Sequence, residues 1–234
     1  MYMKEMLKTS FSESVSGPSM VSKFEMRRKF PNMLGVKNKW GVKIHEVQIN
    51  DSRQALQSLL TCSIDNYIPG MKGATIANYT ELLNFKKDSE GKIVSAVLKD
   101  KLSGKEFVVK SKIFVNCTGV HADTVRKLAN PECKERIIAA RGAHVTFAKE
   151  YLNENEAIII PQTTDGRLIF VISYNGKTMA GTTDVKTHPH FGPSTVEEDV
   201  DFICENLKAT FGDEDIKSKI EASWTGIRPL VLAK

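Results

Sequence analysis

The stretch RGAHVTFAKEYLNENEAIIIPQTTDGRLIFVISYNGKTMAGTTD, residues 141–184, decides the fold of the second half of this chain. Its apolar residues come in short runs of the length typical of β-strands. The dipeptides Asp165-Gly166 and Asn175-Gly176 favour tight hairpin turns, because glycine accepts the left-handed backbone conformation that such turns need. The stretch therefore predicts a largely antiparallel sheet, with strands at 143–147, 157–160, 167–172 and 178–181.

A helix and one more strand should follow this sheet. Thr195-Val196-Glu197-Glu198 matches the capping box with which many helices begin, and the apolar positions after it recur on one helical face. Residues 220–224 resume a strand pattern, which ends at a turn in Gly226-Ile227-Arg228-Pro229. The second half is therefore predicted to be α+β, an antiparallel sheet with a helix over it.

The first half has the mixed pattern of an α/β segment. Residues 41–49 alternate apolar and polar side chains like a strand, and Asn50, Asp51 and Ser52 are candidate N-caps for a helix that follows. We expect one strand or two short ones at 74–85, and then a hairpin formed by residues 92–99 and 106–110.

A possible nucleotide-binding edge follows that hairpin. A short apolar strand at 112–117 (KIFVNC) runs into Thr118-Gly119 and then into a helix at about 122–129. Small residues in a strand, turn and helix arranged this way let backbone amides approach a bound phosphate.

Composition and charge argue against several classes of protein. The chain has 234 residues, of which 41% are hydrophobic and 26% charged, an ordinary mix for a globular protein. The net charge of +5 comes from scattered basic residues, with one run at Arg27-Arg28-Lys29 and no interleaved aromatic residues, so nucleic-acid binding is not predicted. No apolar run approaches the roughly 18–20 residues that span a bilayer. We see no targeting signal, because Glu5 and Glu13 interrupt the first residues.

No metal site is predicted. The four cysteines stand far apart without a C-x-x-C pair, so free thiols are expected. His188 and His190 lie near Asp184 in the sequence, but Pro189 extends the chain between them and no further ligands gather there.

Several motifs follow one another along the chain. They are Gln48-Ile49-Asn50-Asp51-Ser52-Arg53, Gly73-Ala74-Thr75-Ile76-Ala77-Asn78-Tyr79, Val115-Asn116-Cys117-Thr118-Gly119, Gly142-Ala143-His144-Val145, Asp165-Gly166-Arg167, Ala180-Gly181-Thr182-Thr183-Asp184 and Trp224-Thr225-Gly226-Ile227-Arg228-Pro229-Leu230. Each is weak alone. Together, and in this order, they resemble the FAD-dependent, mitochondrial-type glycerol-3-phosphate dehydrogenases.

The resemblance has gaps that suggest an internal fragment. The family's opening G-x-G-x-x-G unit and its terminal G-G-K-x-T-T-Y-R region are absent, and Val120-His121 and Ser173-Tyr174 stand where the family has Pro-Trp. The resemblance implies a partial FAD-binding domain of DAO-like fold and an antiparallel-sheet substrate domain. We assign the chain to a partial substrate or cap segment, a partial FAD-binding domain and a substrate-binding domain at residues 1–49, 50–135 and 136–234.

The resemblance also implies catalytic and substrate-binding residues. His144 would accept the proton of the substrate hydroxyl. Arg228 would bind the substrate phosphate and steady the developing charge, and Thr182 would donate a hydrogen bond to the substrate. The alternatives stay open: a structural strand histidine, a surface arginine and a threonine that packs in a strand.

FAD is the cofactor that the resemblance implies. Thr118 and Gly119 would approach its phosphates through backbone amides, and the backbone of Leu82 would face its adenine, although a core role suits Leu82 equally. The implied reaction oxidises glycerol 3-phosphate to dihydroxyacetone phosphate by hydride transfer to FAD, with quinone as the acceptor and the mitochondrial inner membrane as the location. Two alternatives remain: a related FAD-dependent oxidase that uses oxygen, and a non-catalytic remnant.

Overall fold

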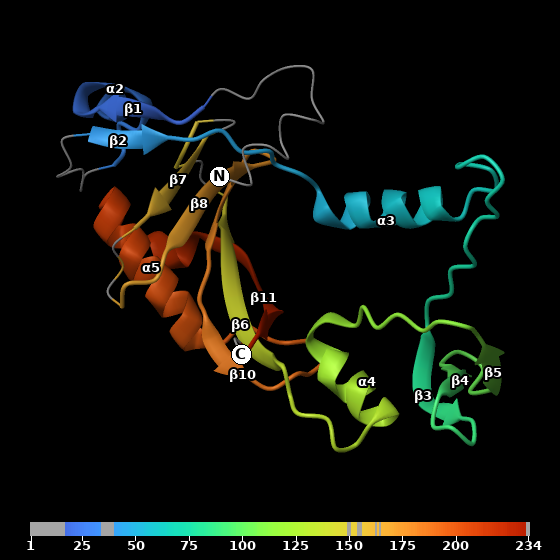
Figure 1. The fold of residues 1–234 in the computed structure, drawn as a ribbon. Helices are drawn as coiled ribbons and strands as arrows, with labels where there is room; N and C mark the ends of the chain where they lie inside the picture. Colours follow the sequence, from blue (N-terminus) through green and yellow to red (C-terminus); the bar gives the residue numbers. More distant parts are fainter. Residues whose placement is uncertain are drawn as a thin grey trace. The chain divides into compact units, whose positions relative to one another are not determined.

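The computed structural model describes residues 17–33, 40–148, 151–153, 156–161, 163 and 165–232. The chain divides into two compact units. Unit 1 comprises Met1–His45, Thr118–Asp123 and Glu135–Lys234, and unit 2 comprises Glu46–Cys117 and Thr124–Lys134. Figure 1 labels the helices and strands.

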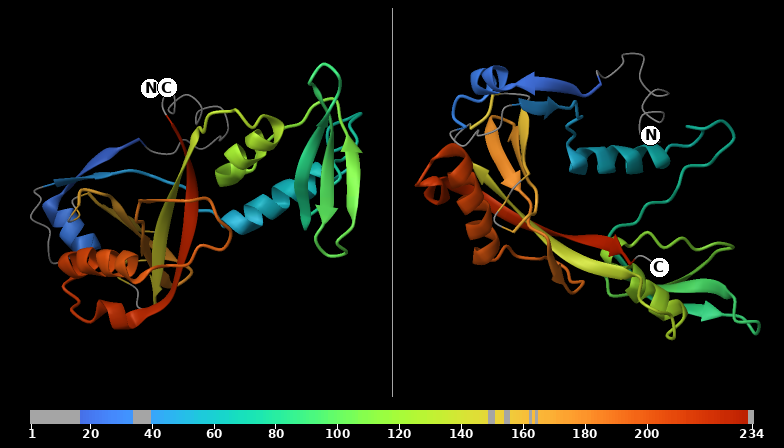
Figure 2. Two further views of the ribbon diagram at one scale, coloured as in Figure 1. Left: turned by 90° about the horizontal axis from the view of Figure 1, so that it is seen from below. Right: turned by 60° about the vertical axis from the view of Figure 1, so that its left-hand side comes forward.

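The centre of unit 1 is a six-stranded antiparallel sheet (Figures 1 and 2). Its strands are β6 (Ile137–Phe147), β7 (Ala157–Ile160), β8 (Ile169–Tyr174), β9 (Lys177–Gly181), β10 (Val185–Thr187) and β11 (Ile220–Val231). β11 pairs with β6 along its whole length, whereas β9 and β10 pair with successive parts of the opposite edge of β6. The predicted antiparallel sheet is therefore confirmed.

Of the two predicted glycine turns, Asn175-Gly176 is a tight hairpin turn, whereas Asp165-Gly166 lies within a longer connection. Asn175 and Gly176 have φ angles of 52° and 72°, and they join β8 to β9, whose last pair in register is Tyr174 with Lys177. Positive φ at both central residues is the requirement of the tight hairpin turn that matches the twist of the strands. Gly166, with φ of 83°, lies in the connection between β7 and β8.

One face of this sheet is covered by α5 (Glu197–Phe211). Ala143, Val145 and Phe147 of β6 are fully buried there, and α5 contributes Ile203 and Leu207 to the same apolar cluster. Burying these side chains together removes apolar surface from water, which stabilises the packing of the helix on the sheet. This confirms the predicted helix over the sheet.

The start of α5 differs from the prediction. Val196 is the N-cap and makes no side-chain hydrogen bond to the helix, so the predicted capping box is not formed. The hydroxyl oxygen of Thr195 instead accepts a hydrogen bond from Thr225 of β11 at 3.0 Å. Acidic residues in the first turn stabilise the helix, because their negative charge lies at the positive end of the helix dipole. Gly212, with φ of 66°, ends the helix.

The predicted turn at Gly226-Ile227-Arg228-Pro229 is also wrong. β11 runs without interruption through these residues, and Gly226 and Pro229 pair in register with Gly142 and Ala139 of β6. A proline is tolerated because β11 pairs with no second strand among the described residues, so its outer edge needs no amide donor.

The remaining elements of unit 1 are short. β1 (Ser19–Ser22) and β2 (Trp40–Lys43) form a two-stranded antiparallel sheet, and α2 (Lys23–Lys29) lies between them in the sequence. The strand predicted at 41–49 therefore extends only to Lys43. The described residues of the unit also form two short 3-10 helices, η2 (Gly119–His121) and η3 (Ile216–Lys219).

Unit 2 contains α3 (Asp51–Cys62) and a three-stranded antiparallel sheet made of β3 (Thr80–Lys87), β4 (Ile93–Asp100) and β5 (Glu106–Lys110). The side chain of Asn50 caps α3 as predicted, by accepting the N–H of Arg53 at 2.9 Å. The predicted hairpin of β4 and β5 is also confirmed. The helix predicted after Gly119 is α4 (Ala122–Ala129).

Two predictions for the first half need correction. The strand predicted over 74–85 is present only from Thr80 onward, as β3, because residues 74–79 are irregular, and residues 112–117 belong to no sheet. A strand exists only through hydrogen bonds to a neighbouring strand, and no strand of the described chain pairs with 112–117. Ile113 and Val115 are consequently 77% and 79% exposed. An apolar run without a partner is not enough to form a strand.

Candidate functional site

Alternate residues of β6 point away from α5, because side chains alternate between the two faces of a strand. Gly142, His144 and Thr146 lie on this second face, which we call the open face. In the neighbouring strands, Gly181 of β9 and Trp224 of β11 pair directly with His144. The open face therefore collects residues from three strands that are far apart in the sequence.

A pocket of about 120 Å³ opens on this face. It is lined by His144, Phe170, Ile172, Met179, Gly181 and Thr182. The lining is mostly apolar, so the imidazole of His144 and the hydroxyl of Thr182 are its chemically distinctive groups.

His144 has a close neighbour on each side. Its ring stacks on the indole of Trp224, with ring centroids 5.4 Å apart and planes 11° from parallel. On the other side, a Cβ at Gly181 would lie 2.4 Å from Cδ2 of His144, so only glycine leaves room for the ring. Nδ1 of His144 is buried and has no hydrogen-bond partner among the described residues.

The surroundings of His144 favour the neutral imidazole. Burial lowers the pKa of His144 below its ordinary value of 6.5, and the positive charge of Arg228 lowers it further. Both effects disfavour the imidazolium. His144 is therefore neutral near pH 7, which is the state that a proton acceptor requires.

Arg228 is held at one edge of its guanidinium. Nη1 donates to the carbonyl oxygen of Thr183 at 3.1 Å, and Nη2 donates to Oγ1 of Thr182 at 2.7 Å. Asp184 lies beside it, with Oδ1 3.6 Å from Nη1. A Cβ at Gly142 would lie 2.4 Å from Nη1, so the missing side chain of Gly142 makes the space for this arginine.

The hydroxyl group of Thr182 makes two hydrogen bonds within the protein. Its hydroxyl donates to the carbonyl oxygen of Thr183 at 3.1 Å while its oxygen accepts from Arg228. In this arrangement Thr182 orients Arg228, and its hydrogen bond to a substrate stays a prediction. Thr183 is fully buried, and its hydroxyl accepts the N–H of Ala143 at 2.9 Å.

The sequence pattern did not single out Gly142, Thr183 or Trp224 as functional residues. Strand register brings them into the site. Each residue contributes to the site only because β6 lies between β11 on one edge and β9 and β10 on the other. The motifs around His144, Thr182 and Arg228 contain these three residues, but nothing local to the sequence shows which side chains meet.

The predicted cofactor-binding residues fall in both units. Thr118 and Gly119 belong to unit 1, at the start of η2, whereas the half-buried Leu82 belongs to β3 of unit 2. Gly119 has φ of 55°, and a Cβ built on it would meet no atom within 4 Å. The carboxylate of Asp123 accepts the N–H groups of Arg136 and Ile137 at 2.7 and 2.8 Å, which ties this segment to the start of β6.

Two features of these residues suit FAD. The open backbone at Gly119 suits a phosphate, and an unpartnered imidazole nitrogen on an apolar open face suits the reacting end of the cofactor. These parts of the chain fit the cofactor. No G-x-G-x-x-G motif, the unit that cradles the pyrophosphate, occurs in the 234 residues.

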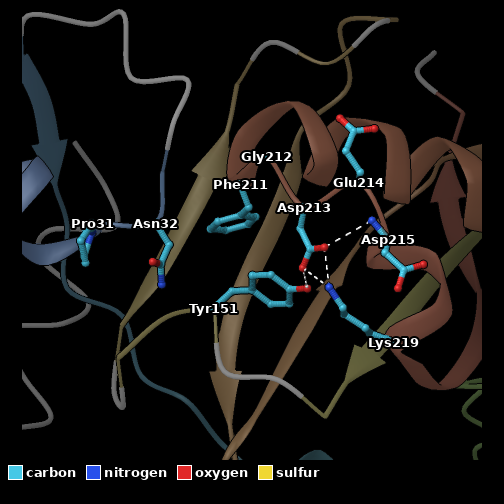
Figure 3. Close-up of a pocket in the computed structure, with 9 residues that line it drawn as sticks. All are labelled: Pro31, Asn32, Tyr151, Phe211, Gly212, Asp213, Glu214, Asp215 and Lys219. Carbon is cyan, nitrogen blue, oxygen red and sulfur yellow. Dashed lines mark hydrogen bonds and ion pairs between the residues drawn. The ribbon is translucent and has the colours of Figure 1, made fainter.

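A larger pocket of about 460 Å³ lies elsewhere in unit 1 (Figure 3). Tyr151, Asp213 and Lys219 point toward one another in it: the tyrosine hydroxyl and the lysine ammonium each lie 2.6 Å from Oδ2 of Asp213. The hydrogen bond from Lys219 leads the effects that lower the pKa of Asp213 to about 2. Because these groups satisfy one another, we interpret the cluster as structural.

The described part of the chain contains neither a cluster suited to a metal ion nor a membrane-spanning helix. No group of three or more histidine, cysteine or acidic residues could hold a metal ion there, and Nδ1 of His190 lies 2.8 Å from the carbonyl oxygen of His188. The helices in those ranges include none with the length and apolar character needed to cross a membrane.

Known proteins are similar to this chain over nearly its whole length. The family model of the FAD dependent oxidoreductases (DAO) matches residues 3–233. A probable mitochondrial glycerol-3-phosphate dehydrogenase of Caenorhabditis elegans is 29% identical over 232 residues, which cover 97% of this chain and 30% of that protein. The chain thus spans less than a third of the length of this relative.

Two solved structures share the fold. The glycerol-3-phosphate dehydrogenase of Bacillus halodurans complexed with FAD has a TM-score of 0.78 and 27% identity, and the match covers 91% of this chain and 42% of that chain. The L-alpha-glycerophosphate oxidase of Mycoplasma pneumoniae with FAD bound has a TM-score of 0.69 and 19% identity, and the match covers 95% of this chain and 56% of that chain. The predicted DAO-like fold is confirmed, and the chain belongs to the family of FAD dependent oxidoreductases.

Proposed function

We propose that this chain supplies the substrate-binding part of an FAD-dependent enzyme that oxidises glycerol 3-phosphate to dihydroxyacetone phosphate. The observation that carries the proposal is the meeting of His144 and Arg228 on the open face. The guanidinium lies over Gly142, two residues before His144, and 35% of the Arg228 side chain remains exposed. When bound, FAD supplies the acceptor for the hydride that leaves the substrate carbon.

The protein groups would share the remaining work. His144, kept neutral by burial and by Arg228, accepts the proton of the substrate hydroxyl. Arg228 binds the phosphate dianion or steadies the negative charge that develops on the substrate oxygen, since a guanidinium can donate two parallel hydrogen bonds. The hydrogen bonds from Arg228 to Thr182 and Thr183 hold the guanidinium in place before the substrate arrives.

The cofactor and acceptor belong to the same proposal. Thr118 and Gly119 would hold the FAD phosphates through their backbone amides, the backbone of Leu82 would hold the adenine, and electrons would pass to quinone. The proposed location is the mitochondrial inner membrane. The name of the Caenorhabditis elegans relative supports the mitochondrion and does not mention the inner membrane. The proposal also includes the division of the chain into a substrate or cap segment, an FAD-binding part and a substrate-binding part.

One observation favours a second candidate. These 234 residues contain no G-x-G-x-x-G, the motif that places a helix N-terminus and open backbone amides against the pyrophosphate. A chain of this kind could keep the fold and the open face without holding FAD, as a non-catalytic remnant.

The purified chain separates these candidates by its colour. Bound FAD absorbs near ~450 nm, and glycerol 3-phosphate added without oxygen should bleach that band as the flavin is reduced. Glycerol, which lacks the phosphate, is the control substrate, and His144→Gln is the control variant. A chain that stays colourless after incubation with FAD would favour the remnant. Recovery of the band on oxygen alone would indicate the oxidase, and recovery only on a quinone would indicate the dehydrogenase.

A further inference from the structure

We infer that Trp224 is a positioning residue for His144: its indole and the backbone of Gly181 hold the imidazole between them and fix the directions of the two ring nitrogens. The inference rests on the proposed function only in giving His144 the role of proton acceptor.

The register of the sheet makes this arrangement possible. Trp224 of β11 and Gly181 of β9 both pair directly with His144, one on each edge of β6. Side chains of directly paired residues share a face and have Cβ atoms roughly 4.5–5.5 Å apart. The imidazole thus has an indole on one side and a strand without a side chain on the other.

The close contacts restrict the ring on both sides. The two aromatic planes are 11° from parallel at a centroid distance of 5.4 Å, a separation typical of offset stacking. On the side of β9 the ring occupies the space that a side chain at position 181 would fill, because a Cβ there would lie 2.4 Å from Cδ2. A ring held in this way presents Nδ1 and Nε2 in constant directions, which a proton acceptor needs.

The indole also shields His144 from water. Phe170, Ile172 and Met179 line the pocket beside the imidazole. The charged groups nearby are Arg228 of β11 and, beyond it, Asp184, whose carboxylate lies 3.6 Å from the guanidinium. Removing the indole would admit water to the imidazole and stabilise its charged form.

Tryptophan fluorescence tests the contact without any flavin or substrate. A protonated imidazole stacked on an indole quenches its emission, and the chain has two tryptophans, so Trp40→Phe leaves Trp224 as the only one. We expect the emission of that variant to fall with decreasing pH, with a midpoint below 6.5, and to lose this transition when His144→Gln is added. Trp224→Phe, which retains Trp40, should show no such transition. Emission that is independent of pH, or a transition that persists with His144→Gln, would overturn the inference.

Proton NMR of the His144 ring gives a second measurement that does not require His144→Gln to fold. We expect Trp224→Leu to move the titration midpoint of His144 upward toward 6.5, and Trp224→Phe to keep it near that of the wild type. An unchanged midpoint in Trp224→Leu would contradict the inference. Because neither measurement uses FAD, a colourless chain that shows both results would count against the proposed oxidation and leave the positioning contact standing.

Discussion

The two faces of the six-stranded sheet are built from alternate residues of the same strands, yet they have opposite characters. On the face under α5, Ala143, Val145 and Phe147 are 0% exposed. On the open face, Gly142 and His144 alternate with them, and Trp224 beside His144 is 42% exposed. One strand thus contributes to the apolar core and to the candidate site at the same time.

This difference shows where the stability of unit 1 resides. Nδ1 of His144 is buried without a hydrogen-bond partner among the described residues, and this costs free energy because the atom has given up its hydrogen bonds to water. The face covered by α5 supplies compensating apolar burial. Substitutions under α5 should therefore change mainly stability, and substitutions on the open face mainly function.

The largest expected effect is on the covered face. Phe147→Ala should lower the free energy of unfolding by about 3–5 kcal/mol, because it leaves a cavity among fully buried side chains. Thr146 precedes Phe147 and lies on the open face. Thr146→Ala should lower the free energy of unfolding by about 1 kcal/mol or less, since it removes one exposed hydrogen bond. Urea unfolding followed by circular dichroism measures both, and equal losses would break the comparison.

A smaller loss is expected from the ion pair under α5. Nε of Arg141 lies 2.9 Å from Oδ2 of Asp199, whose side chain is 4% exposed. Asp199→Asn should lower the free energy of unfolding by about 1–3 kcal/mol, because it weakens a charged hydrogen bond in a buried place. Asp201→Asn on the same helix, where the carboxylate pairs with Lys217 at the surface, should cost less than about 1 kcal/mol. Thermal unfolding of the two variants would contradict this if the surface change cost more.

Gly142→Ala tests the same comparison on the open face. The new Cβ would meet the guanidinium of Arg228 and Oγ1 of Thr182, and the arginine would have to move. We expect a stability loss of about 1 kcal/mol or less and roughly tenfold weaker binding of glycerol 3-phosphate, the loss of about one charged hydrogen bond.

Gly226→Ala is the matched control for this variant. Gly226 pairs in register with Gly142, and a Cβ built there meets no atom within 4 Å. Binding measured by calorimetry should therefore be unchanged. Equal weakening in both variants would show that the effect of Gly142→Ala does not act through Arg228.

The smallest expected effect is a dependence of stability on pH. The pKa of His144 is lowered in the folded chain, so the unfolded chain binds its proton more readily and stability falls as pH decreases below 6.5. The pKa of Asp213 is lowered from 3.8 to about 2, so its contribution is lost only as pH falls through that lower range. In urea unfolding series, His144→Gln should remove the first loss and leave the second. Persistence of the first loss would assign it to another group.

Much of the fold followed from local patterns. The hairpin at Asn175-Gly176, the cap at Asn50 and the β4–β5 hairpin were predictable because each depends on residues adjacent in the sequence. The predictions that failed depend on distant partners. The run at 112–117 has strand-like composition but no neighbour among the described residues, and Thr195 bonds to Thr225 of another strand rather than capping its own helix.

The candidate site divides in the same way. His144, Thr182 and Arg228 could be named from their motifs, and the structure brings all three to the open face. The bond from Arg228 to Thr182, and the turn that proved to be a continuous strand, could not be foreseen. Both follow from the full-length pairing of β11 with β6.

By itself, the sequence determined the family resemblance, the antiparallel sheet and the identities of the reactive side chains, because these are recorded in motifs and in the alternation of residues along each strand. Only the tertiary structure decided that Trp224 stacks on His144, that Gly142 makes room for Arg228 and that α5 closes one face and leaves the other open. The physical reason is register: which residues of distant strands face each other is set by packing the whole sheet against its helix.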